Sequence, residues 1–264
     1  MNGATTSAQA EDQACYVYGV VPDAAPKPAD AAPGVGNPPS PVTLIHHGEV
    51  AALVSEIDPE APLGSPDDLR AHAEVLDTAA KRGPVLPFRF GGVVRDAQAV
   101  TDELLDPFEE RFAAALEDLD GRAQFAVRGA YRQGRILQEI LADRPEIADL
   151  NARTKALPEE AGRYERIRLG EMVAQEMAAR SAADSRALLE RLAPLAVATS
   201  DGAPAADLAV DASFLVDPGR REEFEAAVEE LAGVWAGRID LRLLGPLAPY
   251  DFVTGLIERT VEAS

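Results

Sequence analysis

The chain has 264 residues, of which 47% are apolar, and its 45 acidic against 25 basic side chains give a formal net charge of −20. This length fits one large domain or two modest ones, with enough apolar surface to form a buried core. The negative charge disfavours nucleic acid and anionic membrane surfaces as partners, and no apolar stretch is long enough to span a membrane, so we expect a cytoplasmic protein.

Residues 1–14 are small, polar or acidic, with no basic residue and no apolar block. This composition predicts a disordered tail at 1–14 and does not fit a secretory signal. Cys15 is the single cysteine of the chain, so no internal disulfide can form, which is typical of a reducing cytosol. We expect its thiol to be a small buried group at a strand start, with a reactive thiol as the alternative.

An N-terminal α+β domain is predicted for residues 15–146. The β-rich run 16–21 indicates its first strand, and the Pro/Ala-rich stretch 22–41 that follows indicates an exposed loop. Two further runs, 42–46 and 50–57, are separated by a short Gly-containing turn. They predict a β-hairpin.

The helix starts of this domain carry capping signals. Ser65 is placed to cap a helix that has Pro66 at its first position, and a Gly-Pro pair at 83–84 ends that helix. Asp106 and Pro107 repeat the signal for a second helix. The apolar stripe expected for the first helix is Leu69, Ala73, Leu76 and Ala80. The other elements expected here are a strand at 85–94, a short helix at 96–104, a strand at 123–131 and a helix at 136–141.

A C-terminal domain is predicted for residues 147–264. Its expected elements are a long helix at 158–192, strands at 195–199 and 208–216 flanking a loop at 200–207, a helix after 217–218, a strand at 239–244 and a C-terminal strap. Helix, strand, strand, helix and strand is the order of a split β-α-β unit, the ferredoxin-like type of fold. We therefore predict an α+β protein of two domains, a ferredoxin-like C-terminal one and a related N-terminal α/β sandwich.

The chain has no combination of residues typical of catalysis. It lacks a Gly-rich phosphate loop, a dinucleotide fingerprint and a nucleophile elbow. His46 and His47 adjoin on a strand and point to opposite faces, so we expect surface polar residues rather than metal ligands. His72 lies beside the apolar stripe of its helix, where packing is expected over a general base. We predict no enzyme, no cofactor, and no catalytic or metal-binding residues.

Clusters of acidic residues have structural explanations. Asp67-Asp68 and Glu159-Glu160 lie in the expected first turns of helices, where the helix dipole favours carboxylates. Five further acids are expected on the solvated face of one helix: Glu222, Glu223, Glu225, Glu229 and Glu230. A carboxylate-only magnesium site is the alternative for such residues.

Two segments suggest recognition. In 85–92, Phe88 and Phe90 are expected on one face of a strand with Arg89 on the other, and Pro87 indicates a bulge or an edge strand. Arg89 is expected either in an internal salt bridge or on a recognition edge.

The second segment, 245–252, is stiffened by a glycine and two prolines and ends in an aromatic pair. It is expected to be a strap over the sheet, with a recognition segment as the alternative.

These segments, together with the opening Tyr-Val-Tyr-Gly-Val-Val of residues 16–21, resemble the gas vesicle protein GvpL/GvpF family. That family opens on a Tyr-Val-Tyr-Gly-like strand, carries a Leu-Pro-Phe-Arg-Phe-Gly strand, and has a Gly-Pro-x-Pro-Pro-Tyr-x-Phe segment near its end. The first two motifs are present here as they stand. In the third, Leu247 and Ala248 replace an aromatic residue and a proline, whereas Pro249, Tyr250 and Phe252 match.

The resemblance implies a non-catalytic accessory protein for the assembly of gas vesicles, which are gas-filled organelles walled by a very apolar shell protein, GvpA. Its expected partners are GvpA and other gas vesicle accessory proteins, and its expected location is the cytoplasm, at the gas vesicle. The residues expected to bind a partner are Phe88, Arg89, Phe90, Pro249, Tyr250 and Phe252.

Two other functions fit the sequence. A small-ligand- or metal-binding enzyme on a ferredoxin-like sheet would require a concave pocket with convergent polar groups. A regulatory module would differ from an assembly protein only in the cytosolic protein that it binds.

Overall fold

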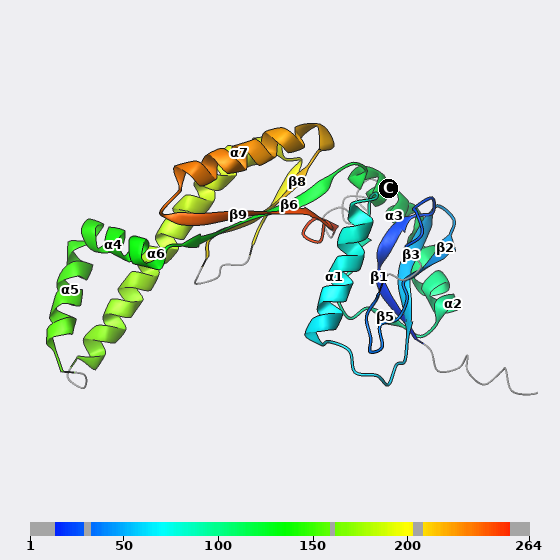
Figure 1. Ribbon diagram of the computed structural model, residues 1–264, viewed down its shortest axis with the longest axis horizontal. Helices are drawn as coiled ribbons and strands as arrows, with labels where there is room; N and C mark the ends of the chain where they lie inside the picture. The colour runs from blue at the N-terminus through cyan, green and yellow to red at the C-terminus, as the bar shows by residue number, and fades with distance from the viewer. Residues whose placement is uncertain (1–13, 29–32, 159–161, 203–207, 254–264) are drawn as a thin grey trace, which may run out of the picture. The chain divides into compact units, whose positions relative to one another are not determined.

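The computed structural model describes residues 14–28, 33–158, 162–202 and 208–253 (Figure 1). The expected tail lies outside this range apart from Ala14, as do Glu159-Glu160, the end of the expected loop at 200–207, and the strap beyond residue 253. The described chain is an α+β protein that contains two separate sheets.

The chain divides into two compact units, one nested within the other along the sequence. Unit 1 combines the residues up to Gln124 with those from Pro246 onward, and unit 2 is the continuous segment Phe125–Gly245. This differs from the boundary expected at residue 147. The strand at 123–131, expected in the N-terminal domain, pairs with strands of unit 2. The segment after Pro246, expected in the C-terminal domain, packs with N-terminal strands in unit 1.

The sheet of unit 1 has the order β2-β3-β1-β4, with β5 also paired to β1, and these pairings are antiparallel (Figure 1). Its strands are β1 (Ala14–Pro22), β2 (Thr43–His47), β3 (Val50–Ile57), β4 (Leu86–Pro87) and β5 (Val93–Val94). The expected hairpin is present as β2 and β3, with His47 opposite Val50 at the turn. The single strand expected at 85–94 is instead two short strands, because the chain turns between them at Gly91, whose φ is +101°.

The helical segments of unit 1 are α1 (Pro66–Ala80), α2 (Ala97–Ala99), the π-helical turn η1 (Val100–Leu105), the 3-10 turn η2 (Asp106–Phe108) and α3 (Glu109–Leu119). The expected cap of α1 is present. The Ser65 hydroxyl accepts a hydrogen bond from the Asp68 amide, and the Asp68 carboxylate accepts one from the Ser65 amide. The expected stripe is shifted: Leu69 is 50% exposed, and the buried residues of α1 are Asp68, His72 and Leu76, at four-residue spacing.

Asp68 does more than cap a helix. Its buried carboxylate also accepts hydrogen bonds from the amides of Gly36 at 2.8 Å and Gly64 at 3.1 Å, so it ties the loop before β2 to the start of α1. The Gly36 amide is the largest cause of a lowered pKa for this carboxyl group, since a bond donated to the charged form favours that form.

Unit 2 contains a sheet of order β7-β8-β6-β9. Its strands are β6 (Ala123–Tyr131), β7 (Ala198–Asp201), β8 (Leu208–Val216) and β9 (Ile239–Leu247), and its helical segments are α4 (Gln133–Asp143), α5 (Pro145–Ala156), α6 (Arg163–Leu192), η3 (Ala193–Leu195), η4 (Pro218–Arg220) and α7 (Arg221–Val234). The polar stretch expected to separate two domains is therefore helix α5. Phe224 of α7 anchors the core, with ring centroids 5.7 Å from Phe125 and 5.2 Å from Phe214.

An ion pair between the half-buried Arg238 and the buried Asp184 links α6 to the rest of unit 2. The Arg238 guanidinium, just before β9, donates two hydrogen bonds of 2.8 Å to Asp184 of α6 and one of 3.1 Å to Glu139 of α4. Tyr131 of β6 donates its hydroxyl to the same aspartate, and burial is the main cause of its raised pKa. The hydrogen bonds on both groups offset the cost of removing these charges from water.

We predict that replacing Asp68 with asparagine lowers the free energy of unfolding at pH 7 by about 1–3 kcal/mol, since the amides of Gly36, Gly64 and Ser65 lose their charged acceptor. The folded pKa of Asp68 lies below its ordinary 3.8, so its contribution is present above that pH and is lost as the pH falls through the folded value. Urea unfolding should show that the difference in free energy of unfolding between Asp68→Asn and wild type is smaller at pH 3 than at pH 7. The control is the neighbouring exposed Asp67→Asn, which should change stability by less than about 0.5 kcal/mol at pH 7.

Candidate functional site

Three segments that are far apart in the sequence meet at His72 of α1, all within unit 1. The imidazole centroid lies 5.7 Å from the ring of Tyr16 in β1, 5.6 Å from Phe90 after β4, and 6.3 Å from Tyr250 after β9. Tyr18 stacks on the same imidazole at 5.6 Å. The two segments expected to bind a partner are therefore brought together, and His72 lies between them.

Hydrogen bonds fix the protonation of this histidine. The Phe88 carbonyl, 3.1 Å from Nε2, can only accept, so Nε2 carries the proton. In the neutral ring Nδ1 is then an acceptor, and the Tyr16 hydroxyl donates to it at 2.8 Å. The Tyr16 oxygen in turn accepts from the Gly91 amide at 3.2 Å. A continuous chain of bonds thus runs from Gly91 to Phe88 through one tyrosine and one histidine.

Burial keeps this chain of bonds uncharged. Desolvation lowers the pKa of His72 below its ordinary 6.5 and, as the largest cause, raises the pKa of Tyr16 to about 12. At neutral pH both groups therefore stay in the protonation states that the hydrogen bonds require.

The turn that carries Arg89 is held at both ends. The Phe88 amide donates to the Tyr18 carbonyl at 2.8 Å, and the Gly92 carbonyl accepts from the Val17 amide at 2.9 Å. Glycine is needed at 91 because a positive φ strains other residues. Arg89 itself is exposed, and within the described chain it has no ion pair, so the internal salt bridge considered from the sequence is absent.

Phe88 and Phe90 do not share one environment, contrary to the expected alternation. The Phe88 ring lies 6.2 Å from Phe112 of α3, whereas Phe90 packs 5.6 Å from Tyr16 beside α1. Both rings are half-buried. The turn between β4 and β5 breaks the period of two on which the expectation depended.

The C-terminal segment of unit 1 docks on α1. The Ala248 amide donates to the Asp77 carboxylate at 3.0 Å, and Asp251 and Gln124 exchange two hydrogen bonds. Pro249 and Phe252 are buried, and Tyr250 is half-buried with its pKa raised mainly by desolvation. Of the six residues expected to bind a partner, five thus contribute packing, and Arg89 alone is fully exposed.

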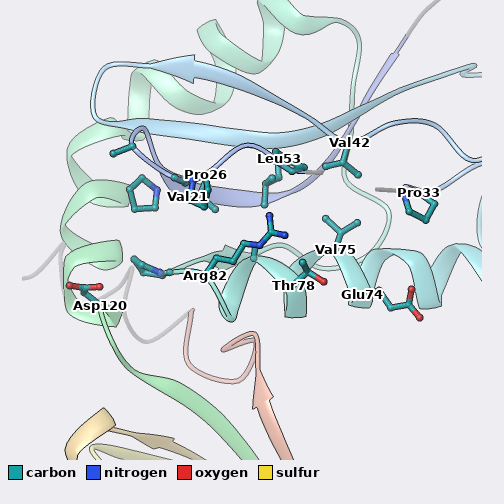
Figure 2. A pocket seen from close by; sticks show the side chains of 17 residues that line it. Val21, Pro26, Pro33, Val42, Leu53, Glu74, Val75, Thr78, Arg82 and Asp120 are labelled. Carbon is teal, nitrogen blue, oxygen red and sulfur yellow. The ribbon is translucent and has the colours of Figure 1, made fainter. Parts of the chain in front are cut away.

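An aliphatic groove of about 400 Å³ lies between α1 and the Pro-rich loop after β1 (Figure 2). Figure 2 shows Val42 and Leu53 facing Val75 of α1, with the Arg82 side chain reaching between them. Pro26 and Pro33 of the loop also line it, well apart from each other (Figure 2). The sequence predicted a loop here but not a groove beneath it.

The other candidate residues have local structural roles. Cys15 is buried in β1, and burial raises the pKa of its thiol, which disfavours the reactive thiolate. His46 lies 2.6 Å from Asp23, and His47 lies 3.2 Å from Asp106, each as a surface pair.

The acidic residues of α7 mostly face solvent. Three of the five expected on the solvated face lie within ion-pair distance of arginines: Glu223, Glu225 and Glu230. Among the residues that the structure describes, no group of three or more His, Cys, Asp or Glu side chains could hold a metal ion. None of the described helices combines the length and the apolar character needed to cross a membrane.

Comparisons with known proteins agree with the motifs that meet at His72. The family model "Gas vesicle synthesis protein GvpL/GvpF" matches residues 14–254. Gas vesicle protein F of Streptomyces sp. strain CB03234 is 36% identical over 90% of this chain and 98% of its own length, and gas vesicle protein L of that strain is 30% identical over 95% and 96%. The crystal structure of GvpF from Anabaena sp. PCC7120 superposes with a TM-score of 0.71 at 26% identity, covering 91% of this chain and 98% of that one.

We predict that the His72→Phe variant is less stable than wild type by about 1–3 kcal/mol at pH 8, because the Phe88 carbonyl and the Tyr16 hydroxyl lose their partner. The folded pKa of His72 lies below the unfolded 6.5, so the contribution of the neutral ring is complete above that pH and is lost as the pH falls through the folded value. Urea unfolding between pH 8 and pH 5 should show the difference in free energy of unfolding between wild type and His72→Phe becoming smaller as the pH falls. A difference that stays constant over this pH range would show that His72 is not held neutral in the folded protein.

Proposed function

We propose a function from one premise: the chain belongs to the gas vesicle synthesis protein GvpL/GvpF family. It is a non-catalytic accessory protein of gas vesicle assembly that binds the shell protein GvpA, other gas vesicle proteins, or both. Its place is the cytoplasm, at the growing vesicle. The observation that carries this is the match to gas vesicle proteins along nearly the whole chain, 98% of the length of the Streptomyces protein F included.

The contact to the partner is made at the Arg89 turn. Arg89 is exposed on a turn whose two ends are fixed by hydrogen bonds, so the backbone that carries it has little freedom to lose on binding. A guanidinium recognises carboxylates through two parallel hydrogen bonds. The half-buried rings of Phe88, Phe90 and Tyr250 provide apolar surface beside it.

The charge of the chain supports a role in keeping an apolar protein dispersed. A net charge of −20 makes complexes that contain this protein repel one another. An apolar shell subunit bound to it would therefore be kept from aggregating before assembly.

A ferredoxin-like fold for unit 2 is part of this proposal. Its order along the chain is strand, helices, two strands, helix and strand, with β6 as the first strand and the spatial order β7-β8-β6-β9. This is the arrangement that a split β-α-β unit requires. The α/β sandwich proposed for unit 1 rests on α1 and α3, which both contact β1.

We predict that Arg89→Glu reduces recovery of the shell protein at least tenfold when tagged protein and GvpA are co-expressed and co-purified at moderate salt. The matched control is Lys27→Glu, which makes the same charge change at an exposed lysine of unit 1 that has no ion pair in the described structure and should retain recovery.

Both variants should melt within about 2 °C of wild type, because exposed substitutions change stability little. If Arg89→Glu recovers as much shell protein as wild type does, Arg89 is not part of the contact. A folded wild-type protein that recovers no shell protein would overturn shell binding.

A further inference from the structure

Helices α5 and α6 form a hairpin that extends from unit 2. The 30-residue α6 is about 45 Å long at 1.5 Å per residue, yet its buried residues, Asp184, Leu188 and Leu192, all lie in its last third. Figure 1 shows α5 and the first part of α6 reaching past the sheet of their unit. The body of unit 2 therefore leaves the tip of this hairpin largely uncovered.

The tip exposes large apolar side chains. Tyr164 is 74% exposed and Ile167 is 54% exposed, both in the first turns of α6, and Leu157 after α5 is 36% exposed. Tyr164 and Ile167 are three residues apart on the helix and so lie on one face. Exposed aromatic and branched residues at one place are typical of a protein contact.

The tip is also basic in a strongly acidic protein. Residues 153–168 contain five basic and three acidic side chains, whereas the remaining 248 residues contain 20 basic and 42 acidic ones. Arg153, Lys155, Arg163 and Arg168 are exposed and have no ion pair among the described residues. Four cations that have no ion pair in the described part of the chain, beside exposed apolar residues, favour a partner that brings carboxylates.

The surface between the two helices is grooved. Two adjoining cavities of about 540 and 410 Å³ share Leu150, Arg153 and Arg168. Glu146, Asp149 and Glu165 also line them, so charges of both signs border an apolar floor. Met172 extends that floor in the first cavity, and Tyr164 forms a wall of the second. A groove between helices receives the side-chain ridge of a third helix.

We propose that the tip of the α5–α6 hairpin binds an acidic amphipathic helix of a partner protein. The apolar stripe of that helix contacts Tyr164 and Met172, and its carboxylates pair with Arg153 and Arg168. Nucleic acid and anionic lipid are disfavoured because the rest of the chain, 22 charges negative, repels extended polyanions. This surface is distinct from the Arg89 turn and does not depend on the function proposed for it.

Fluorescence anisotropy with synthetic 21-residue helices tests the inference on the full chain. One probe carries a leucine stripe with glutamate on its polar face, and a second carries lysine in place of glutamate. Wild type should bind the acidic probe at least tenfold more tightly than the basic one, and binding should weaken as salt screens the pairs.

The variant Arg153→Glu/Arg168→Glu should lose at least tenfold in affinity for the acidic probe, and Tyr164→Ala should lose several-fold. Arg186→Glu/Arg242→Glu is the matched control: it makes the same charge change at exposed arginines of unit 2 outside the tip that have no ion pair in the described structure, and it should bind as wild type does. Circular dichroism verifies that each variant is folded.

Three results would overturn the inference. The first is no binding of the acidic probe by wild type. The second is equal loss in the tip variant and the control. The third is tighter binding of single-stranded RNA or phosphatidylserine vesicles than of the acidic helix, lost in the tip variant, which would assign the tip to another class of partner.

Discussion

The structure of unit 1 depends on one neutral imidazole. His72 donates to a backbone carbonyl on one side and accepts from a tyrosine hydroxyl on the other, and each of these groups belongs to a different segment of the chain. A buried polar group costs free energy unless it is paired, so this site is stable only when β1, the Arg89 turn and α1 are all in place. The backbone position of the exposed Arg89 thus depends on the buried groups of Tyr16 and His72.

Aromatic residues are scarce, at 5% of the chain, and several of the few present are concentrated here. Tyr16, Tyr18, Phe90 and Tyr250 all lie within 6.3 Å of the imidazole centroid. Rigid rings order fewer rotatable bonds than aliphatic side chains of similar area. They therefore suit a site in which a hydrogen-bonded chain must be held in one arrangement.

Local signals in the sequence predicted those features that are themselves local. Ser65 and Pro66 specified the start of α1, and the two β-rich runs around Gly48 specified the hairpin. The alternation of residues 208–216 predicted β8 with its bounds. Nearest-neighbour chemistry determines each of these, so no knowledge of the remaining chain was needed.

Features that depend on distant partners were missed. The sequence predicts the strand at 123–131 but not the unit to which it belongs, because its neighbours β8 and β9 lie far along the chain. The sequence predicts His72 only at a packing boundary, because its own helix carries no sign of the tyrosine that it meets 56 positions away. The four-residue spacing of Asp68, His72 and Leu76 was the available sign of the buried face of α1. It is hard to recognise because two of these three residues are charged or polar. The motif around Arg89 is visible in the sequence, yet the exposure of Arg89 follows from a turn that only the folded sheet creates.

The nested arrangement of the units has a consequence for synthesis on the ribosome. Unit 2 emerges whole, whereas unit 1 needs Ala248 and Tyr250, which follow the entire insert, to fill its core. At about 5–20 residues per second, the early strands wait on the order of ten seconds for their closing segment. The usual order, in which the N-terminal part of a chain completes first, is reversed. During that interval α1 and β1 present an unfilled apolar face to solvent, which chaperones and proteases can bind until residues 248–250 are available to cover it.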